Sequence, residues 1–465
     1  MTNFDYIPNV MSRKQRVFSN RMLFLIGLFS VTQLRLPGFA LCISEFPIYL
    51  VAPFLFFRNY HLLKRHGMLF IIWFGIAVSV ACVISGLYNH TYPFLIFKGL
   101  SSTYPLFAFP VVLHHFLWRN FNGLRWLLLG FSISFVISTF AFQTSVEVHM
   151  LAGGMTGSEA TEAIIKGPIF WIGRLQNFVM LPIYGWYLNT PLLYSILGPV
   201  GMAMFSMLTS TSGRAAALGA LGGAFIAMLC GKTPNTLRRF GRNFFFIFIV
   251  ALAGLLILNK VYHLAAKSGW LGRQALEKYE KQTKGSTSIL RLLMGGRGEA
   301  FIAMLAALDK PIMGHGPWAI DDGGYVDEFL SKYGDAEDFE KHAKSRAYQY
   351  RTVGVVYGYI PAHSQIFSFW MWFGIVGFAY WLYVLYSIFR YLHKEMTAVP
   401  QWVGFLAVGA PAFLWNVFFS GLGIRIFTMP YLVVLIMAHN VYKGRIRVPF
   451  EEQQEMLRVN LKRSA

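Results

Sequence analysis

The sequence predicts an all-α polytopic membrane protein with about 12 transmembrane helices and one large loop. Hydrophobic residues make up 55% of its 465 residues and charged residues only 13%. The mean hydropathy of +0.48 lies outside the range of ordinary soluble domains. Several apolar runs reach about 18 to 20 residues, the length that spans a lipid hydrocarbon core. Their apolarity is continuous rather than alternating, which indicates helices and excludes a porin-like barrel.

The spans follow from these apolar runs and from the breaks between them. We predict them at residues 22–35, 38–57, 68–87, 93–114, 123–143, 169–188, 191–211, 214–230, 243–259, 364–389, 401–421 and 424–442. The sixth and seventh are separated only by a short break ending at Pro191, a residue that cannot continue a preceding helix cleanly. The chain then divides into helices 1–9 (1–259), a loop with the candidate motifs (260–363), helices 10–12 (364–442) and a tail (443–465).

Lysine and arginine positions predict the orientation, because cytoplasmic loops of membrane proteins are enriched in both. About half of the 41 basic residues fall in alternate loops and at the two ends of the chain. They are Arg13, Lys14, Arg16, Arg21, Arg58, Lys64, Arg65, Arg119, Arg125, Lys232, Arg238, Arg239, Arg242, Arg390, Lys394, Lys443, Arg445, Arg447, Arg458, Lys462 and Arg463. Both termini are therefore predicted to be cytoplasmic, with segment 260–362 on the opposite side.

The net charge of +20 is explained mostly by this topological bias, so no nucleic-acid partner is predicted. The first apolar run lacks a small-residue cleavage pattern and is predicted to stay as a start-transfer helix. The three cysteines, Cys42, Cys82 and Cys230, all fall in predicted spans, which implies no disulfide framework in the loop. No HExxH, paired CxxC or Walker A pattern is present, so neither a metal nor a cofactor is predicted.

The loop contains two segments whose residue types suit anion binding and proton transfer. In GGRGEAF, two glycines precede Arg297, and Glu299 follows in what we predict to be the first turn of a helix. An arginine beside free backbone amides at a helix start attracts phosphate-like anions. His363 ends the loop just before the next span. In DKPIMGHGPW, His315 lies between two glycines and is a candidate substrate-binding residue, although the pattern suits a plain turn equally well.

Three motifs together resemble the superfamily of O-antigen ligases and O-antigen polymerases. They are TSTSGRAAALGAL, GGRGEAFIAMLAALDKPIMGHGPW and AHSQIFSFWMWFGIVG, which cover roughly residues 200–385. The resemblance implies a GT-C-type membrane glycosyltransferase of the bacterial inner membrane. Such enzymes transfer a glycan from undecaprenyl diphosphate to a lipid or glycan acceptor at the periplasmic face, with inversion and without a metal. Arginines can take the place of a metal in holding a diphosphate leaving group.

The resemblance also implies roles for individual residues. Arg214 and Arg297 match the arginines that bind the donor diphosphate. His363 matches the catalytic histidine, which either activates the acceptor hydroxyl or orients the sugar, and whose ordinary pKa near 6.5 suits proton transfer. The family commonly has Asn after this histidine, whereas this chain has Ser364. That difference weakens any role assigned to the second position.

Three further basic residues are candidate donor-site contacts. Arg174 and Arg425 fall near the outer ends of predicted spans, where an arginine can equally be an interfacial anchor. Lys98 lies about five residues into its predicted span and Glu45 about eight, at depths of roughly 8–12 Å. The similar depth predicts an ion pair between them. The alternative is that Lys98 helps to hold the donor phosphate.

Other functions remain open from the sequence. A lipid or anion transporter would place ionisable residues near the membrane midplane and show repeated halves, whereas here the polar residues cluster in one loop. A scaffold role for the loop alone is a weaker possibility. Between the two enzymes, a single large outer loop favours a ligase that uses lipid A core as acceptor. A polymerase would extend a lipid-linked repeat and would more often divide its outer polar residues between two loops.

Overall fold

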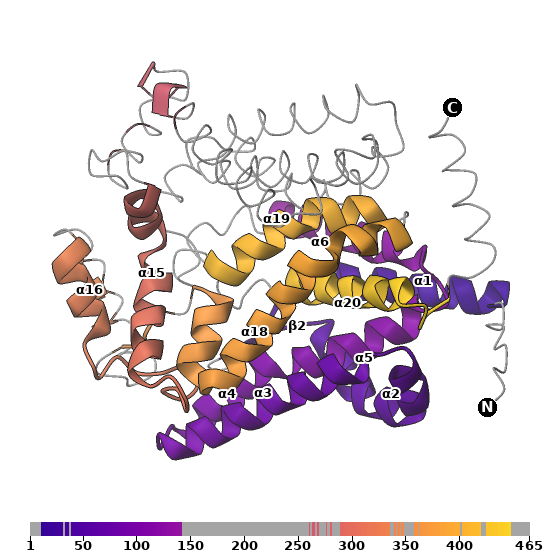
Figure 1. Cartoon of the computed structure of the whole chain (residues 1–465), viewed down its shortest axis with the longest axis horizontal. Helices are drawn as coiled ribbons and strands as arrows, with labels where there is room; N and C mark the ends of the chain where they lie inside the picture. Colours follow the sequence, from indigo (N-terminus) through magenta and orange to yellow (C-terminus); the bar gives the residue numbers. More distant parts are fainter. Residues whose placement is uncertain are drawn as a thin grey trace.

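The protein is mostly helical in a computed structural model, with one short β-hairpin among the described residues (Figure 1). The structure describes residues 11–30, 33–36, 39–141, 289–334, 358–361, 363–399, 402–419 and 425–447, and scattered residues between 260 and 347. Spans predicted within 169–259 therefore lie outside the described residues. The number of spans stays a prediction.

The chain begins with a helix, a hairpin and a second helix. Helix α1 (Arg13–Leu28) starts with a capping box, in which Ser12 accepts from the Gln15 backbone N–H and the Gln15 side chain accepts from the Ser12 N–H. Strands β1 (Gln33–Leu36) and β2 (Phe39–Cys42) pair antiparallel. Helix α2 (Glu45–Arg65) follows.

This arrangement corrects the first two predicted spans, 22–35 and 38–57. Helix α1 ends at Leu28, and α2 begins only at Glu45, because the intervening chain forms the two strands. The two residues between the strands are Pro-Gly, which is a strong turn signal. The predicted spans follow the run of apolar residues instead and ignore this signal. Glu45 is thus the first residue of its helix rather than eight residues inside it.

The next helices agree closely with their predicted spans. Helix α3 (Leu69–Tyr88) is continuous, whereas the fourth span is divided into α4 (Pro93–Thr103) and α5 (Pro105–Leu117). Each half starts with proline at its first position, where no backbone N–H is needed. Helix α6 (Gly123–Ala141) packs along α1, and α5 packs against α2 and α3.

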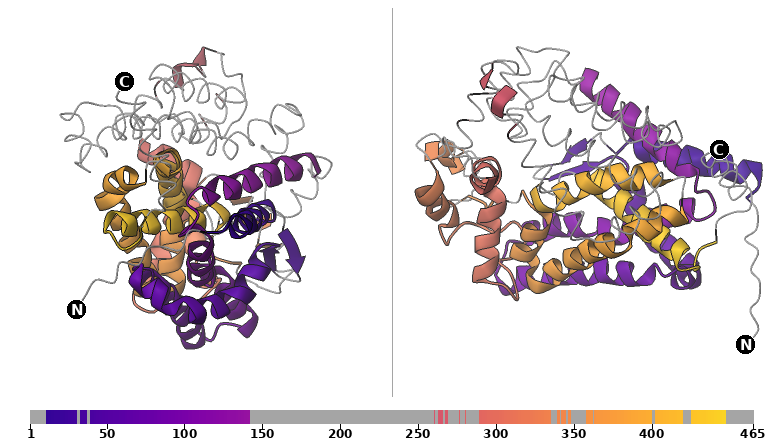
Figure 2. Two further views of the ribbon diagram at one scale, coloured as in Figure 1. Left: turned by 90° about the vertical axis from the view of Figure 1, so that its right-hand side faces the viewer. Right: turned by 45° about the horizontal axis from the view of Figure 1, so that its top comes forward.

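The C-terminal half surrounds the long helix α18 (Gln365–Ala398), which packs against α3, α15, α19 and α20. Helices α15 (Ile289–Asp309) and α16 (Tyr325–Tyr333) belong to the predicted outer loop. They lie together at one end of the described bundle, at the left in Figure 1 and in the right-hand view of Figure 2. Helices α19 (Val403–Phe419) and α20 (Arg425–Tyr442) match the last two predicted spans.

Three described helices are long and apolar enough to cross a membrane. Basic residues and the motif-bearing loop lie beside different ends of these helices. They are Leu69–Tyr88, Pro93–Leu117 and Gln365–Ile388. At one end of α3, Gly67 lies against Asn440 of α20 and against Arg445, one of the predicted cytoplasmic basic residues. At its other end, Ser85 and Asn89 donate hydrogen bonds to Trp372 and Gly314 carbonyls beside the loop. Among the described residues, Arg445 of the basic tail and the Gly314 turn of the motif-bearing loop therefore contact opposite ends of α3, and the orientation in a membrane stays a prediction.

Candidate functional site

The Arg297 segment forms a kink inside α15. Arg297 itself has a non-helical backbone (φ −145°, ψ 31°), and the helix continues on both sides of it. The predicted helix start is therefore the start of the second half of α15. Glu299 lies in the first turn of that half. Gly298 leaves room for the Phe329 ring of α16, which a Cβ at this position would contact at 2.8 Å.

His363 is held in place by the residue that follows it. The Ser364 Oγ accepts the backbone N–H of Phe367 (3.2 Å), which makes Ser364 the N-cap of α18. The same hydroxyl donates to the Val417 carbonyl of α19 (3.2 Å) and is fully buried. Serine and asparagine are both preferred N-cap residues. The departure from the commoner Asn is thus compatible with the structural role of this position.

The kink in α15 and the start of α18 bring an acid and a histidine together. The Nδ1 atom of His363 lies 2.6 Å from Oε2 of Glu299, and the two side chains are 53% and 46% exposed. A carboxylate can only accept, so Nδ1 carries the hydrogen and the carboxylate orients the ring. Proton transfer to or from a substrate would then involve the second ring nitrogen, Nε2.

Arg297 and two further helix ends complete the surroundings of this pair. The Arg297 guanidinium carbon lies 5.3 Å from the centroid of the Trp415 ring on α19, within cation–π range. The Gln365 Nε2 atom donates to Thr428 Oγ1 at 3.1 Å, which joins the starts of α18 and α20. Arg425 begins α20, so its backbone lies one turn before this contact. Its side chain is outside the described set.

His315 occupies a separate, structural position. Its Nε2 atom donates to the Ala306 carbonyl (2.8 Å), and its backbone N–H donates to the Met371 carbonyl (2.6 Å). Burial lowers the pKa of His315 below its ordinary value, and the nearby Lys310 adds to this effect. The side chain therefore ties the 310–316 turn to α15 and α18. These contacts show how the turn is held, and a substrate-binding role for His315 stays a prediction.

Lys98 lies against aromatic residues of the outer segment. Its ammonium is 3.5 Å from the centroid of the Trp318 ring and 5.7 Å from that of Tyr359. The predicted ion pair does not form between Lys98 and Glu45, since Glu45 begins α2 and Lys98 turns toward the loop. The ion-pair prediction relied on a depth for Glu45 that the β-hairpin removes.

Two residues of the site were not recognised from the sequence. From the sequence, Glu299 indicates only the start of a helix, and Trp415 is only one of the aromatic residues in a predicted span. The Arg-Gly-Glu sequence contains one signal for Glu299: it lies two residues after Arg297 and therefore in the same turn. Its partner, however, follows from the packing of α15 against α18. Trp415 gives no sequence signal that separates it from other interfacial aromatic residues.

Arg214 and Arg174, predicted for the donor site, lie outside the described residues. Of the remaining predicted residues, the structure brings together Arg297 and His363, with the start of α20 nearby. Across the described ranges, no group of three His, Cys, Asp or Glu side chains is arranged to hold a metal ion.

Comparison with known proteins adds one finding. Residues 199–382 match the model of a family described as O-antigen ligase. Comparison with curated proteins and with solved structures gives no match. The matched range contains Arg214, Arg297, Glu299, His315 and His363, and it leaves Lys98, Arg174, Trp415 and Arg425 outside. The kinked segment of α15 that contains Glu299 and the capped start of α18 beside His363 both fall within the matched range.

Proposed function

We propose that this chain, a member of the O-antigen ligase superfamily by the match of its residues 199–382, transfers a glycan from undecaprenyl diphosphate to lipid A core. The reaction takes place at the periplasmic face of the inner membrane, with inversion and without a metal. The proposed architecture is a GT-C-type bundle of about 12 spans. The observation that carries this proposal is the Glu299–His363 pair with Arg297 beside it, at the bundle end away from the basic loops.

In the proposed reaction, the acceptor hydroxyl oxygen attacks the anomeric carbon of the donor sugar. The new C–O bond forms as the bond to the diphosphate breaks, and undecaprenyl diphosphate leaves as an anion. His363 Nε2 takes the hydroxyl proton, and Glu299 stabilises the imidazolium that results. Arg297, together with Arg214, neutralises the charge that develops on the diphosphate. Attack opposite the leaving group inverts the anomeric configuration.

The remaining predicted residues have supporting roles in this proposal. Arg174, Arg425 and Lys98 contribute positive charge along the path of the donor. His315 acts through the 310–316 turn, because its ring nitrogen is engaged by the Ala306 carbonyl. The half exposure of both His363 and Glu299 leaves room for a bulky acceptor to approach.

The test is transfer by purified protein from a defined undecaprenyl-diphosphate glycan. Lipid A core and a lipid-linked repeat are offered as acceptors in separate tubes. We expect product with lipid A core, and a loss of about 10²–10⁴-fold in rate for His363→Ala. Arg297→Ala should also lose transfer, and Arg297→Lys should not restore it, because lysine lacks the bidentate fork.

Matched controls are His61→Ala and Arg125→Ala, two exposed residues far from the pair in the fold. Both should keep the wild-type rate. Product only with the lipid-linked repeat would make the protein a polymerase instead of a ligase. Unchanged product from well-folded His363→Ala would refute the enzymatic role assigned to this residue.

A further inference from the structure

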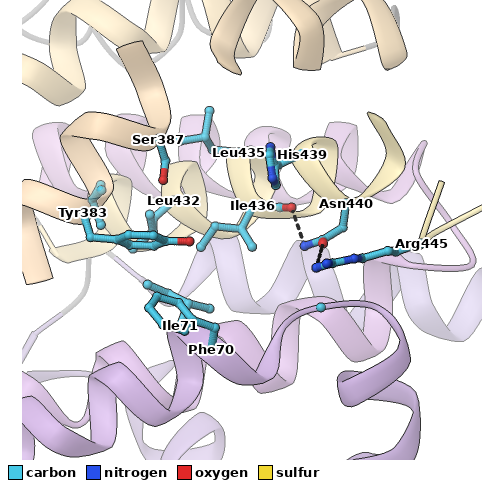
Figure 3. A pocket seen from close by; sticks show the side chains of 12 residues that line it. Phe70, Ile71, Tyr383, Ser387, Leu432, Leu435, Ile436, His439, Asn440 and Arg445 are labelled. Atoms are coloured by element: carbon cyan, nitrogen blue, oxygen red, sulfur yellow. Dashed lines mark hydrogen bonds between the residues drawn. The ribbon is translucent and has the colours of Figure 1, made fainter. Parts of the chain in front are cut away.

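A cavity of about 200 Å³ lies at the end of the bundle opposite to the Glu299–His363 pair. It is enclosed by α3, α18 and α20 (Figure 3). Its lining is apolar in the middle and polar at the ends. The lining includes Phe70, Ile71, Tyr383, Leu432, Ile436 and Arg445.

The polar ends of the cavity face one another. In Figure 3 the Tyr383 hydroxyl and the Arg445 guanidinium point toward each other from opposite sides. The Arg445 Nη1 atom donates to Asn440 Oδ1 at 3.4 Å, which directs the guanidinium toward the cavity. Gly67 makes room for this arrangement, since a Cβ there would overlap both Asn440 and Arg445, and its φ of +68° suits glycine.

One wall of the cavity reaches the outer surface of the bundle. The Phe70 and Tyr383 rings lie 4.8 Å apart between centroids, and Phe70 is 56% exposed. Both residues belong to helices that are apolar and long enough to cross a membrane. In a membrane their exposed surface would face lipid chains, and the cavity lies beside them.

The charge around the polar end suits an anion. Lys394 and Lys443 both place their ammonium groups near the Tyr442 ring, at 5.4 and 5.9 Å from its centroid. Arg445 follows directly after Lys443 and Gly444 in the chain. Arg445 is the cation that lines the apolar space between the helices.

We propose that this cavity binds an anionic glycerophospholipid, with its phosphate on Arg445 and part of one acyl chain between α3, α18 and α20. An apolar cavity of about 150 Å³ holds a benzene molecule, so about 200 Å³ accommodates a segment of a chain. Arginine binds a phosphate through two parallel hydrogen bonds. Basic pockets between membrane helices are suited to anionic head groups. The site lies toward the C-terminal part of α18, away from the candidate active site beside the start of that helix, and the two share no residue.

The experiment measures the thermal unfolding midpoint of the full chain in a non-ionic detergent. Phosphatidylglycerol, phosphatidylcholine and soluble glycerol 3-phosphate are added in separate series. A ligand that binds only the folded state raises the midpoint. We expect phosphatidylglycerol to raise it by several degrees, phosphatidylcholine to raise it much less, and glycerol 3-phosphate to leave it unchanged.

Three variants locate the effect. Arg445→Ala should remove most of the phosphatidylglycerol shift, and Arg447→Ala, which removes the same charge two residues further on and outside the cavity, should keep it. Ile436→Phe, which fills the apolar part, should also reduce the shift. Equal shifts with phosphatidylcholine, an equal loss in Arg447→Ala, or a full shift with glycerol 3-phosphate would each overturn the proposal.

Discussion

At the scale of single residues, the proposed chemistry depends on which nitrogen of His363 faces the substrate. Glu299 accepts from Nδ1 at 2.6 Å, which fixes the ring and its tautomer. Arg297 is oriented separately, by the Trp415 ring at 5.3 Å. Proton transfer and anion binding are thus assigned to different side chains, each held by a different neighbour. Substitutions of these side chains should therefore differ in their effects on kcat and KM.

Glu299→Gln tests the orienting role, because it keeps the size of the side chain and removes its charge. We expect kcat for transfer to fall by about 10²-fold while KM for the donor stays near the wild-type value. Arg297→Ala should instead raise KM for the donor as well. Steady-state rates over a range of donor concentrations make the distinction. A wild-type kcat in folded Glu299→Gln would show that the carboxylate does not assist His363.

At the scale of elements, the 310–316 turn is docked into a break in α18. Gly374 interrupts that helix with φ +63°. The Ile375 N–H donates to the Ile312 carbonyl at 3.1 Å, and the His315 N–H donates to Met371 at 2.6 Å. The break therefore lets the turn replace helical hydrogen bonds. It also connects α15, which contains Arg297 and Glu299, to the helix that begins beside His363.

Gly374→Ala should disrupt this docking. A Cβ at Gly374 would overlap the Ile312 carbonyl oxygen, and alanine would also be strained at a positive φ. Gly324→Ala is the comparison variant, because Gly324 lies in the ordinary left-handed region (φ +70°, ψ 24°) with nothing within 4 Å of its added Cβ, whereas Gly374 (φ +63°, ψ −152°) has a backbone restricted to glycine as well as the overlap. We expect Gly374→Ala to lower the thermal midpoint far more than Gly324→Ala and to reduce transfer. Equal effects would contradict the role given to Gly374 in docking the turn.

At the scale of the whole molecule, the structure separates two ends. Helices α15 and α16 with the Glu299–His363 pair lie at one end (Figure 1), and the described basic loops, together with the cavity of Figure 3, lie at the other. In a membrane this separation would place the transfer reaction and the lipid cavity in opposite leaflets. The charge distribution predicts which leaflet is which.

Single cysteines test this orientation. In a background without the three native cysteines, Lys332→Cys on α16 should react with a membrane-impermeant maleimide added to spheroplasts. Lys394→Cys should react only after the membrane is permeabilised. Both positions are exposed, so access to the reagent decides the result. The opposite labelling pattern would reverse the orientation and rule out a periplasmic reaction.

The sequence gives reliable information where a property depends on local composition. Continuous apolar runs indicate helices because a backbone in lipid must satisfy its own hydrogen bonds. The bounds of α3, α19 and α20 therefore agree closely with prediction. Where local signals compete, as at Pro37 and Gly38, the apolar count gives the wrong result. Because the hairpin is not predicted, the sequence analysis places Glu45 inside a span instead of at the start of α2. The ion pair predicted from that depth is therefore wrong.

The membrane class, the helical architecture and the motifs with Arg297 and His363 follow from residue types and their order along the chain. The partners of those residues follow only from packing. Glu299 meets His363, Trp415 supports Arg297, and Lys98 lies over Trp318 because helices distant in sequence pack side by side. Such contacts depend on helix rotation and on kinks at Arg297 and Gly374, which a pattern of apolar residues does not specify.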